Sequence, residues 1–252
     1  MPAIVVVSVM LRPTMVRQPW SESKEAKSRY VKELFSSLAP RYNWLTDIWT
    51  FGLHRIWKKQ AMLLCALQPG ERVLDVATGT GDLAALAAAA VGPSGQVVGV
   101  DFCEAMLRVA QCRNREAIVF RVEDATDLHF ADASFDVVTI GFGLRNVADR
   151  KKALHEFGRV LRPGARLMVL DFSAPSSKFL AAIHDLFFFV LMPTFGRVVA
   201  WHRDAHHYTA DSIRGWVSKN KLSEMILEAG FTDVRFVSLS GGFAAVHLAR
   251  RR

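Results

Sequence analysis

Acidic and glycine residues with the spacing of a nucleotide-binding turn lie in the first half of the chain. Asp75 ends a short apolar segment, and the turn that follows contains Gly79, Thr80 and Gly81. Glycines in such a turn allow a tight bend and a close approach of the backbone to a ligand. Asp101 follows about 20 residues later, where an acid meets the hydroxyl groups of a ribose in nucleotide-binding α/β folds. The spacing predicts a site for a cofactor that contains a ribose.

Two cofactor classes fit this turn, and Asp75 distinguishes them. The pattern Gly79-x-Gly81-x-x-Ala84 also matches a dinucleotide fingerprint. A carboxylate beside the turn would repel the pyrophosphate of NAD, whereas it would attract the ammonium group of a methionine moiety. Asp75 therefore favours S-adenosylmethionine over NAD. The alternative is that Asp75 and Asp101 only cap a helix or stabilise a turn.

A parallel sheet is needed to bring these residues to one edge. Strand-like apolar segments alternate with helical segments, which indicates a mostly parallel sheet with helices on both faces. Strands are expected at 73–76, 96–100, 118–123, 135–140 and 166–172, with a closing pair at 232–239 and 243–249. Ligands of such sheets bind at the carboxyl ends of the strands, so Asp75, Asp101, Asp124 and Gly141 should face one crevice.

The helical segments include two of unusual composition. Ordinary amphipathic or alanine-rich helices are expected at 28–38, 82–90, 149–160 and 218–229. The aromatic and polar mixture at 40–58 could cover a pocket or form a helical cap on the sheet. The apolar segment 179–201 is interrupted by His184 and Asp185 and broken at Pro193, so it is too short for a membrane span. Core, a lid over an apolar substrate, and a face resting on a membrane are its three interpretations.

Composition limits the classes of protein that the chain can belong to. The 252 residues are 51% hydrophobic and 22% charged, as in a globular domain. The net charge of +8 suits an anionic membrane, and because no RNA-binding signature accompanies the scattered basic residues, no nucleic-acid partner is expected. Three cysteines without zinc or redox spacing predict a reducing compartment. The N-terminal segment could be a transit peptide.

Histidines near residue 204 offer a weak indication of a metal site. His202 and His206 stand four residues apart with Asp204 between them, and His207 follows. No cysteine or carboxylate completes a recognisable ligand pattern, so no metal is expected. One of these histidines, or His54 farther up the chain, could instead accept a proton.

The chain from about residue 27 onward resembles the UbiE/MenG/Coq5 family of quinone C-methyltransferases. The matching segments are FGLHRIWK at 51–58, GTGDL at 79–83, Asp101 with EAML at 104–107, and FGLRNV at 142–147. A generic methyltransferase would share the glycine turn but not the last segment. Residues 206–209 depart from the family pattern, and Gly141 stands where a serine is common.

The resemblance implies a fold, a reaction and a set of contacts. The fold would be a class I, Rossmann-like methyltransferase with an antiparallel C-terminal strand and a helical lid. The reaction would transfer a methyl group from S-adenosylmethionine to a ring carbon of a prenylated benzoquinol or naphthoquinol. Cofactor contacts carried over by position are Thr80, Asp101, Asp124, Ala125 and Gly141, with Asp75, Gly79 and Gly81 lining the same turn.

Methylation of an aromatic carbon requires an electron-rich ring, and Arg145 and Asn146 are the expected catalytic residues. A quinol that loses a hydroxyl proton has a nucleophilic ring carbon, and a sulfonium is already a strong electrophile, so no metal is required. Arg145 has too high a pKa, above about 12, to act as a base, but it could stabilise the oxyanion. Asn146 could orient it. The alternative for Arg145 is a salt bridge to a nearby acid.

The remaining expectations concern organisation and partners. Residues 1–27 are expected to be an extension without fixed structure, and 28–252 one domain with a lid at about 175–217. The protein is expected in the cytoplasm at the inner membrane face, or in an organelle matrix if a transit peptide is present, in contact with anionic lipid. A homodimer or a quinone-synthesis complex is possible. Rival functions are methylation of another aromatic or lipid substrate, an NAD-dependent activity, and a non-catalytic subunit. The ring type and tail length stay open.

Overall fold

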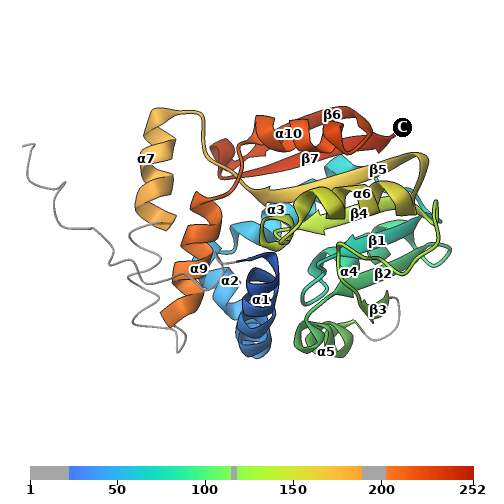
Figure 1. Cartoon of the computed structure of the whole chain (residues 1–252), viewed down its shortest axis with the longest axis horizontal. Coiled ribbons are helices and arrows are strands. Elements are labelled where there is room, and N and C mark those ends of the chain that lie inside the picture. Colours follow the sequence, from blue (N-terminus) through green and yellow to red (C-terminus); the bar gives the residue numbers. More distant parts are fainter. Residues whose placement is uncertain (1–22, 115–117, 189–202) are drawn as a thin grey trace, which may run out of the picture.

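A seven-stranded sheet forms the centre of the protein (Figure 1). The computed structural model describes residues 23–114, 118–188 and 203–252. The strand order is β3-β2-β1-β4-β5-β7-β6. The strands are β1 Arg72–Val76, β2 Gln96–Asp101, β3 Ile118–Val122, β4 Phe135–Gly141, β5 Leu161–Phe172, β6 Phe231–Leu239 and β7 Ala244–Arg251. Strands β1 to β5 pair in parallel, and β7 is antiparallel to both neighbours, which confirms the expected fold class.

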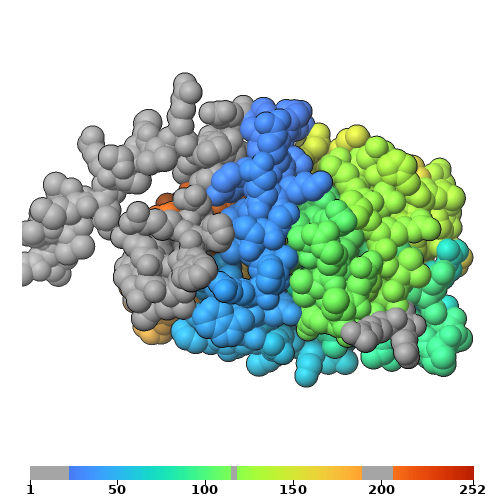
Figure 2. All heavy atoms as spheres, turned by 90° about the horizontal axis from the view of Figure 1, so that it is seen from below, coloured from blue at the N-terminus to red at the C-terminus, as the bar shows by residue number. Residues whose placement is uncertain are grey.

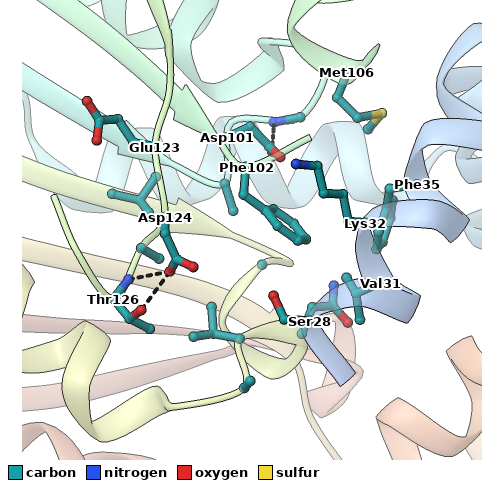
Figure 3. Close-up of a pocket in the computed structure, with 18 of the residues that line it drawn as sticks. Ser28, Val31, Lys32, Phe35, Asp101, Phe102, Met106, Glu123, Asp124 and Thr126 are labelled. Atoms are coloured by element: carbon teal, nitrogen blue, oxygen red, sulfur yellow. Dashed lines mark hydrogen bonds between the residues drawn. The ribbon is translucent and has the colours of Figure 1, made fainter. Parts of the chain in front are cut away.

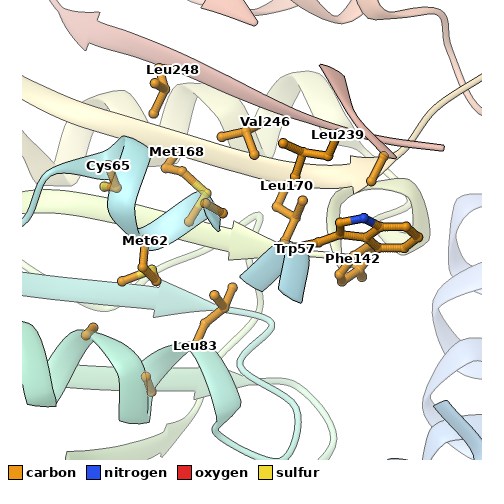
Figure 4. Close-up of a cluster of buried hydrophobic side chains, with 14 of the residues drawn as sticks. Trp57, Met62, Cys65, Leu83, Phe142, Met168, Leu170, Leu239, Val246 and Leu248 are labelled. Carbon is orange, nitrogen blue, oxygen red and sulfur yellow. The ribbon is translucent and has the colours of Figure 1, made fainter. Parts of the chain in front are cut away.

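Helices cover both faces of the sheet because its central strands are apolar on both sides. The helices of the domain are α3 Leu53–Cys65, α4 Asp82–Val91, α5 Glu104–Arg113, α6 Arg150–Val160 and α10 Lys219–Glu228. One buried cluster joins the sheet to α3 and α4 around Trp57 and Met168 (Figure 4). A second cluster joins the opposite face to α6 and α10 around Phe157 and Leu222. Each fully buried side chain of this size stabilises the fold by roughly 1.5–3 kcal/mol.

A separate group of helices lies at the carboxyl ends of the strands. It comprises α1 Lys24–Leu38, a short 3₁₀ turn at Ala39–Arg41, α2 Tyr42–Thr50 and α9 Arg203–Arg214. Val31, Leu34 and Leu38 of α1 pack with Leu45 and Tyr208 in one buried cluster. Figure 2 shows α1, in blue, lying along the green segment that contains α5. The segment 40–58 is therefore helical, and its α2 part covers the carboxyl ends of the strands.

Two element boundaries differ by four or more residues from those expected from the sequence. Helix α1 begins at Lys24 rather than at residue 28, because the Ser23 hydroxyl caps it by accepting the Ala26 N–H at 3.0 Å. Strand β5 begins at Leu161 rather than at residue 166. Helices α5 and α9 were not foreseen from the sequence. Residues 1–22 of the expected extension lie outside the described residues.

The apolar segment after β5 is partly described. Helix α7 spans Lys178–Leu186, and Phe187 and Phe188 continue it. Phe179, Ile183 and Leu186 are exposed, so the core interpretation is wrong for this face of α7, whereas Phe188 is buried. Residues 189–202, including Pro193, lie outside the described residues. No helix in the described ranges is long and apolar enough to cross a membrane.

Candidate active site

A cavity of about 630 Å³ opens at the carboxyl ends of β1, β2 and β4 (Figure 3). Its volume lies within the range of about 300–1,000 Å³ that is usual for small-molecule sites. One wall is α1, through Ser28, Val31, Lys32 and Phe35, and the opposite wall consists of strand ends. The strand-end residues in its lining include Gly79, Asp101, Asp124, Ala125, Gly141 and Asn146.

Asp101 ends β2 and holds the glycine turn to the following helix. Its two carboxylate oxygens accept the N–H of Gly79 and of Cys103, each at 2.9 Å. The side chain is buried at the floor of the cavity, and burial raises its pKa to about 6. The carboxylate is therefore ionised at neutral pH and lies where a polar ligand group in the cavity could reach it.

The other strand-end residues supply backbone and carboxylate groups. Asp124 accepts the backbone N–H and the hydroxyl of Thr126 at 2.7 and 2.8 Å through one oxygen. Ala125 lies beside it in the cavity lining. A Cβ atom on Gly141 would collide with the side chain of Leu83, so the glycine permits close packing of β4 on α4.

The glycine turn has a different role at each position. Gly79 and Gly81 have positive φ angles of 58° and 83°, which glycine adopts without strain. Gly79 lines the cavity, whereas Gly81 lines neither this cavity nor the smaller one beside it and instead precedes α4. The Thr80 hydroxyl donates to Asn43 of α2 at 2.6 Å, which joins the turn to the helical layer.

Asp75 lies apart from the large cavity, which corrects the expectation that it shares one crevice with Asp101. It is fully buried, and its oxygens accept the hydroxyls of Thr78 at 2.6 Å and Thr139 at 2.7 Å. Burial raises its pKa to about 6. These contacts match the turn-stabilising alternative, and contact with an ammonium group stays a prediction.

A smaller cavity of about 70 Å³ adjoins the first and has Asp75 in its wall. The two cavities share Phe35, Tyr42, Gly79, Gly141 and Phe142 among their lining residues. The smaller one is lined further by Thr50, His54 and Lys58 from α2 and α3, and by Arg145, Phe172 and Phe188. The two cavities therefore meet at these shared residues.

Arg145 lies in a 3₁₀ turn, Leu144–Asn146, at the wall of the smaller cavity. Its Nη1 donates to Asp171 at 2.8 Å and to the Phe142 carbonyl, and its guanidinium stacks on Phe172. Burial raises the pKa of Asp171, and the charge of Arg145 opposes this rise. The salt bridge named as the alternative role is thus present. Among the described residues the Nε–H of Arg145 has no acceptor.

Asn146 lines the large cavity next to the same turn. Its side-chain oxygen accepts the Tyr208 hydroxyl at 3.1 Å, and its amide nitrogen donates to the Phe142 carbonyl at 3.4 Å. Arg145 and Asn146 therefore line different cavities, on either side of Phe142, which lines both. Their catalytic roles stay predictions.

Sequence reasoning missed the contribution of α1. Lys27 donates to the carbonyls of Arg145 at 3.0 Å and Val147 at 3.4 Å. Burial, and then the charges of Arg150 and Arg145, lower its pKa to about 8. In the sequence, the apolar side chains of this helix indicated only that it packs against the rest of the protein. No local pattern predicts a contact between residues 118 positions apart.

The histidines divide into one near the site and several elsewhere. His54 is buried and bonded to Thr50 at 2.7 Å, and burial lowers its pKa to about 4, so the ring is neutral at pH 7. His202 and the side chain of His206 lie outside the described residues. Over the described ranges no three side chains form a group suited to holding a metal ion.

Comparison with known proteins places this geometry in a family. The chain matches the ubiE/COQ5 methyltransferase family over residues 22–251. It is 42% identical over 226 residues to the ubiquinone/menaquinone biosynthesis C-methyltransferase UbiE of Ectopseudomonas mendocina, covering 88% of each chain. It is 41% identical over 230 residues to the UbiE protein of Yersinia enterocolitica, covering 89% of this chain and 92% of that protein.

Solved structures share the fold at lower identity. A SAM-dependent methyltransferase from Thermotoga maritima aligns with a TM-score of 0.62 at 20% identity, over 87% of this chain and 99% of that one. A phosphoethanolamine methyltransferase from Haemonchus contortus, determined with S-adenosylhomocysteine, aligns with a TM-score of 0.54 at 18% identity, over 73% and 49%. At these identities the likeness concerns the fold alone.

Proposed function

The chain belongs to the ubiE/COQ5 methyltransferase family and is a methyltransferase, and on this premise we propose that it methylates a ring carbon of a prenylated benzoquinol or naphthoquinol. The methyl donor is S-adenosylmethionine, and the product belongs to ubiquinone or menaquinone biosynthesis. The relatives that carry this activity in their names match the chain over almost its whole length. The observation that supports the proposal most directly is the pair of adjoining cavities.

The large cavity fits the donor in size and in polar groups. Asp101 offers a buried carboxylate for the ribose hydroxyls at the end of β2. Asp124 and Ala125 would contact the adenine, with Gly141 in the wall of the same cavity. Gly79 and Thr80 would lie against the methionine moiety, Gly81 would support the turn from outside the cavities, and Asp75 would lie behind it. When bound, S-adenosylmethionine supplies an electrophilic methyl group.

The residues of the smaller cavity would act on the acceptor. The unpaired Nε–H of Arg145 would donate to the acceptor oxygen as its proton leaves. Asn146 would fix the orientation of the turn through Tyr208. The ring carbon would take the methyl group as the carbon–sulfur bond of the donor breaks, and the ring proton would pass to water, which restores aromaticity. Arg145 cannot accept either proton because it remains charged.

We also propose that the protein contacts an anionic membrane. The acceptor carries an apolar tail, the net charge is +8, and apolar side chains of α2 and α7 are exposed. Surface segments that combine apolar area with positive charge bind anionic lipid.

A methylation assay tests the proposed reaction. The purified protein is incubated with methyl-labelled S-adenosylmethionine and reduced quinone precursors, and the products are identified by mass spectrometry. We expect label on a quinol ring, and a loss of at least about tenfold in cofactor affinity for Asp101→Ala. Glu104→Ala, which removes only an exposed helical ion pair, is the matched control. Cofactor binding without labelling of any quinol would indicate a non-catalytic subunit or a different acceptor.

A further inference from the structure

Five phenylalanine rings form a continuous series from the smaller cavity to the surface. In order they are Phe142, Phe172, Phe188, Phe187 and Phe51. Their successive ring centroids are 4.9, 5.3, 5.0 and 5.3 Å apart, which is contact distance for aromatic pairs. We call these five residues the aromatic ladder. They come from four separate parts of the chain, so the ladder is a product of the tertiary fold.

The inner rings of the ladder are buried, and the outermost ring is exposed to water. Phe142, Phe172 and Phe188 line the smaller cavity and are 8%, 7% and 2% exposed. Phe187 is half-buried, and Phe51 is 77% exposed. Phe51 ends α2 in the left-handed region, with φ of 49°, which places its ring against Phe187. The series therefore ends at a ring that lies mostly in water.

Two apolar helix faces flank the outer end of the ladder. Trp44, Ile48 and Phe51 follow one another at helical spacing along α2, and all three are exposed. Phe179, Ile183 and Leu186 repeat this pattern on α7, directly before Phe187. The ladder therefore leads out to apolar surface on both of its sides.

The size of the smaller cavity shows which wall must move when an acceptor binds. A cavity of about 150 Å³ holds benzene, and this one measures about 70 Å³. Asp75, Thr50 and Arg145 are hydrogen-bonded in its wall, so moving them would leave buried polar groups unpaired. The rings of the ladder can change rotamer without that penalty, so they are the side that can move.

We propose that the aromatic ladder is the binding path of the acceptor's prenyl tail. The quinol ring would occupy the smaller cavity next to Arg145, and the tail would displace Phe188 and Phe187 and leave the protein at Phe51. Branched, unsaturated hydrocarbon matches aromatic walls in chemistry, and the path needs no polar partner. The inference rests on the proposed function, because it assumes a prenylated acceptor.

Tail-dependent kinetics test the path. Two acceptors with the same ring are compared, one with a long prenyl tail and one with a single isoprene unit. Phe51→Asn is the first variant, since asparagine tolerates the left-handed conformation. Leu63→Asn on α3 is the matched control, because Leu63 is 79% exposed and lies outside the ladder. Phe187→Ala changes the next ring inward.

We expect the wild-type protein and Leu63→Asn to prefer the long-tailed acceptor by the same ratio of kcat/KM. Phe51→Asn and Phe187→Ala should reduce this ratio about five- to tenfold. A ratio that stays at the wild-type value in both ladder variants would overturn the proposal. So would an equal loss for both acceptors, because it would mean that the rings only maintain packing.

A binding measurement separates this proposal from the proposed function. Farnesol carries the tail chemistry without a ring to methylate, so its affinity, measured by isothermal titration calorimetry, reports on the tail path without any methylation. We expect farnesol to bind the wild-type protein and Leu63→Asn equally and to bind Phe51→Asn more weakly. Farnesol binding with no methylation of any quinol would count against the proposed function alone. No farnesol binding, with methylation intact, would count against the ladder alone.

Discussion

The ion pair between Arg145 and Asp171 determines which substitution can test the catalytic role of the arginine. Asp171 is 2% exposed and depends on Arg145 for charge compensation. Removing one partner of a buried pair typically costs about 3–5 kcal/mol. Arg145→Ala is therefore expected to destabilise the fold, and loss of activity in that variant would not identify a role in the reaction.

Arg145→Lys is the better test. Lysine keeps the positive charge beside Asp171 but has no planar fork and lacks the Nε–H, which has no acceptor in the described structure. We expect single-turnover methylation to slow on the order of a hundredfold, as after loss of one oxyanion donor, while affinity for S-adenosylmethionine changes little. Arg162→Lys, at an exposed pair with Asp136, controls for the substitution itself. Turnover of Arg145→Lys near the wild-type rate would make Arg145 a structural residue.

The position of each residue along its strand explains which site residues could be predicted from the sequence. Asp101, Asp124 and Gly141 lie at or just after the carboxyl ends of β2, β3 and β4, and the rule that ligands bind at these ends was enough to bring them to one cavity. Asp75 is different because it pairs with Gly99 and Thr139, two residues before Asp101 and Gly141, so it lies deeper in the sheet. Sequence analysis identified the acid correctly but could not assign it to the smaller cavity, because that cavity forms only when α2 and α3 cover the strand.

At the scale of elements, α1 is held to the rest of the protein in two ways. Its second half contributes Val31, Leu34 and Leu38 to a buried cluster. Its first half has no buried side chain and is held by Lys24 to Asp149 and by Lys27 to the turn that carries Arg145. Both halves of α1 line the large cavity, and the polar anchors of the first half exchange with water more readily than the buried apolar contacts of the second.

The depressed pKa of Lys27 makes a prediction about stability and pH. Between about pH 8 and its usual value near 10.5, the folded protein binds fewer protons at Lys27 than the unfolded chain. Lys27 therefore contributes a rise in the free energy of unfolding with pH over this window. Lys27→Met lacks this contribution. Between pH 7 and pH 9.5, we expect the unfolding free energy of the wild type minus that of Lys27→Met to increase by on the order of 1 kcal/mol.

Urea unfolding followed by circular dichroism at pH 7 and pH 9.5 measures this difference. Lys32→Met, on the same helix, is the control, and its difference from wild type should not change in this way. A difference for Lys27→Met that is constant or falls with pH would show that Lys27 is solvated rather than buried against Arg145 and Arg150.

At the scale of the whole molecule, features that follow from local sequence patterns were predictable, whereas features that depend on long-range contacts were not. The alternation of strands and helices predicted the mostly parallel sheet, and the family resemblance implied its antiparallel C-terminal strand. The aromatic ladder was not predictable, because Phe51, Phe142 and Phe187 meet only after the helices of the N-terminal third fold over the strand ends. The expectations for 189–202 lie outside the described residues, so the proposed lid is supported here only by α7 and by Phe187 and Phe188.

Membrane contact is a property of the whole surface, and vesicle co-sedimentation tests it. The protein has a net charge of +8, and Phe51 and Phe179 are exposed on the two helices that flank the proposed tail path. Each basic side chain near an anionic surface contributes about 1 kcal/mol, and salt weakens this attraction. We expect the protein to sediment with anionic vesicles at low salt, to be released at high salt, and to bind neutral vesicles weakly.

Phe179→Asn should reduce the bound fraction severalfold, whereas Leu63→Asn should not. If the wild-type protein stays in the supernatant at low salt, with and without a prenylated quinol, then it takes its acceptor from solution and the apolar faces of α2 and α7 serve another purpose.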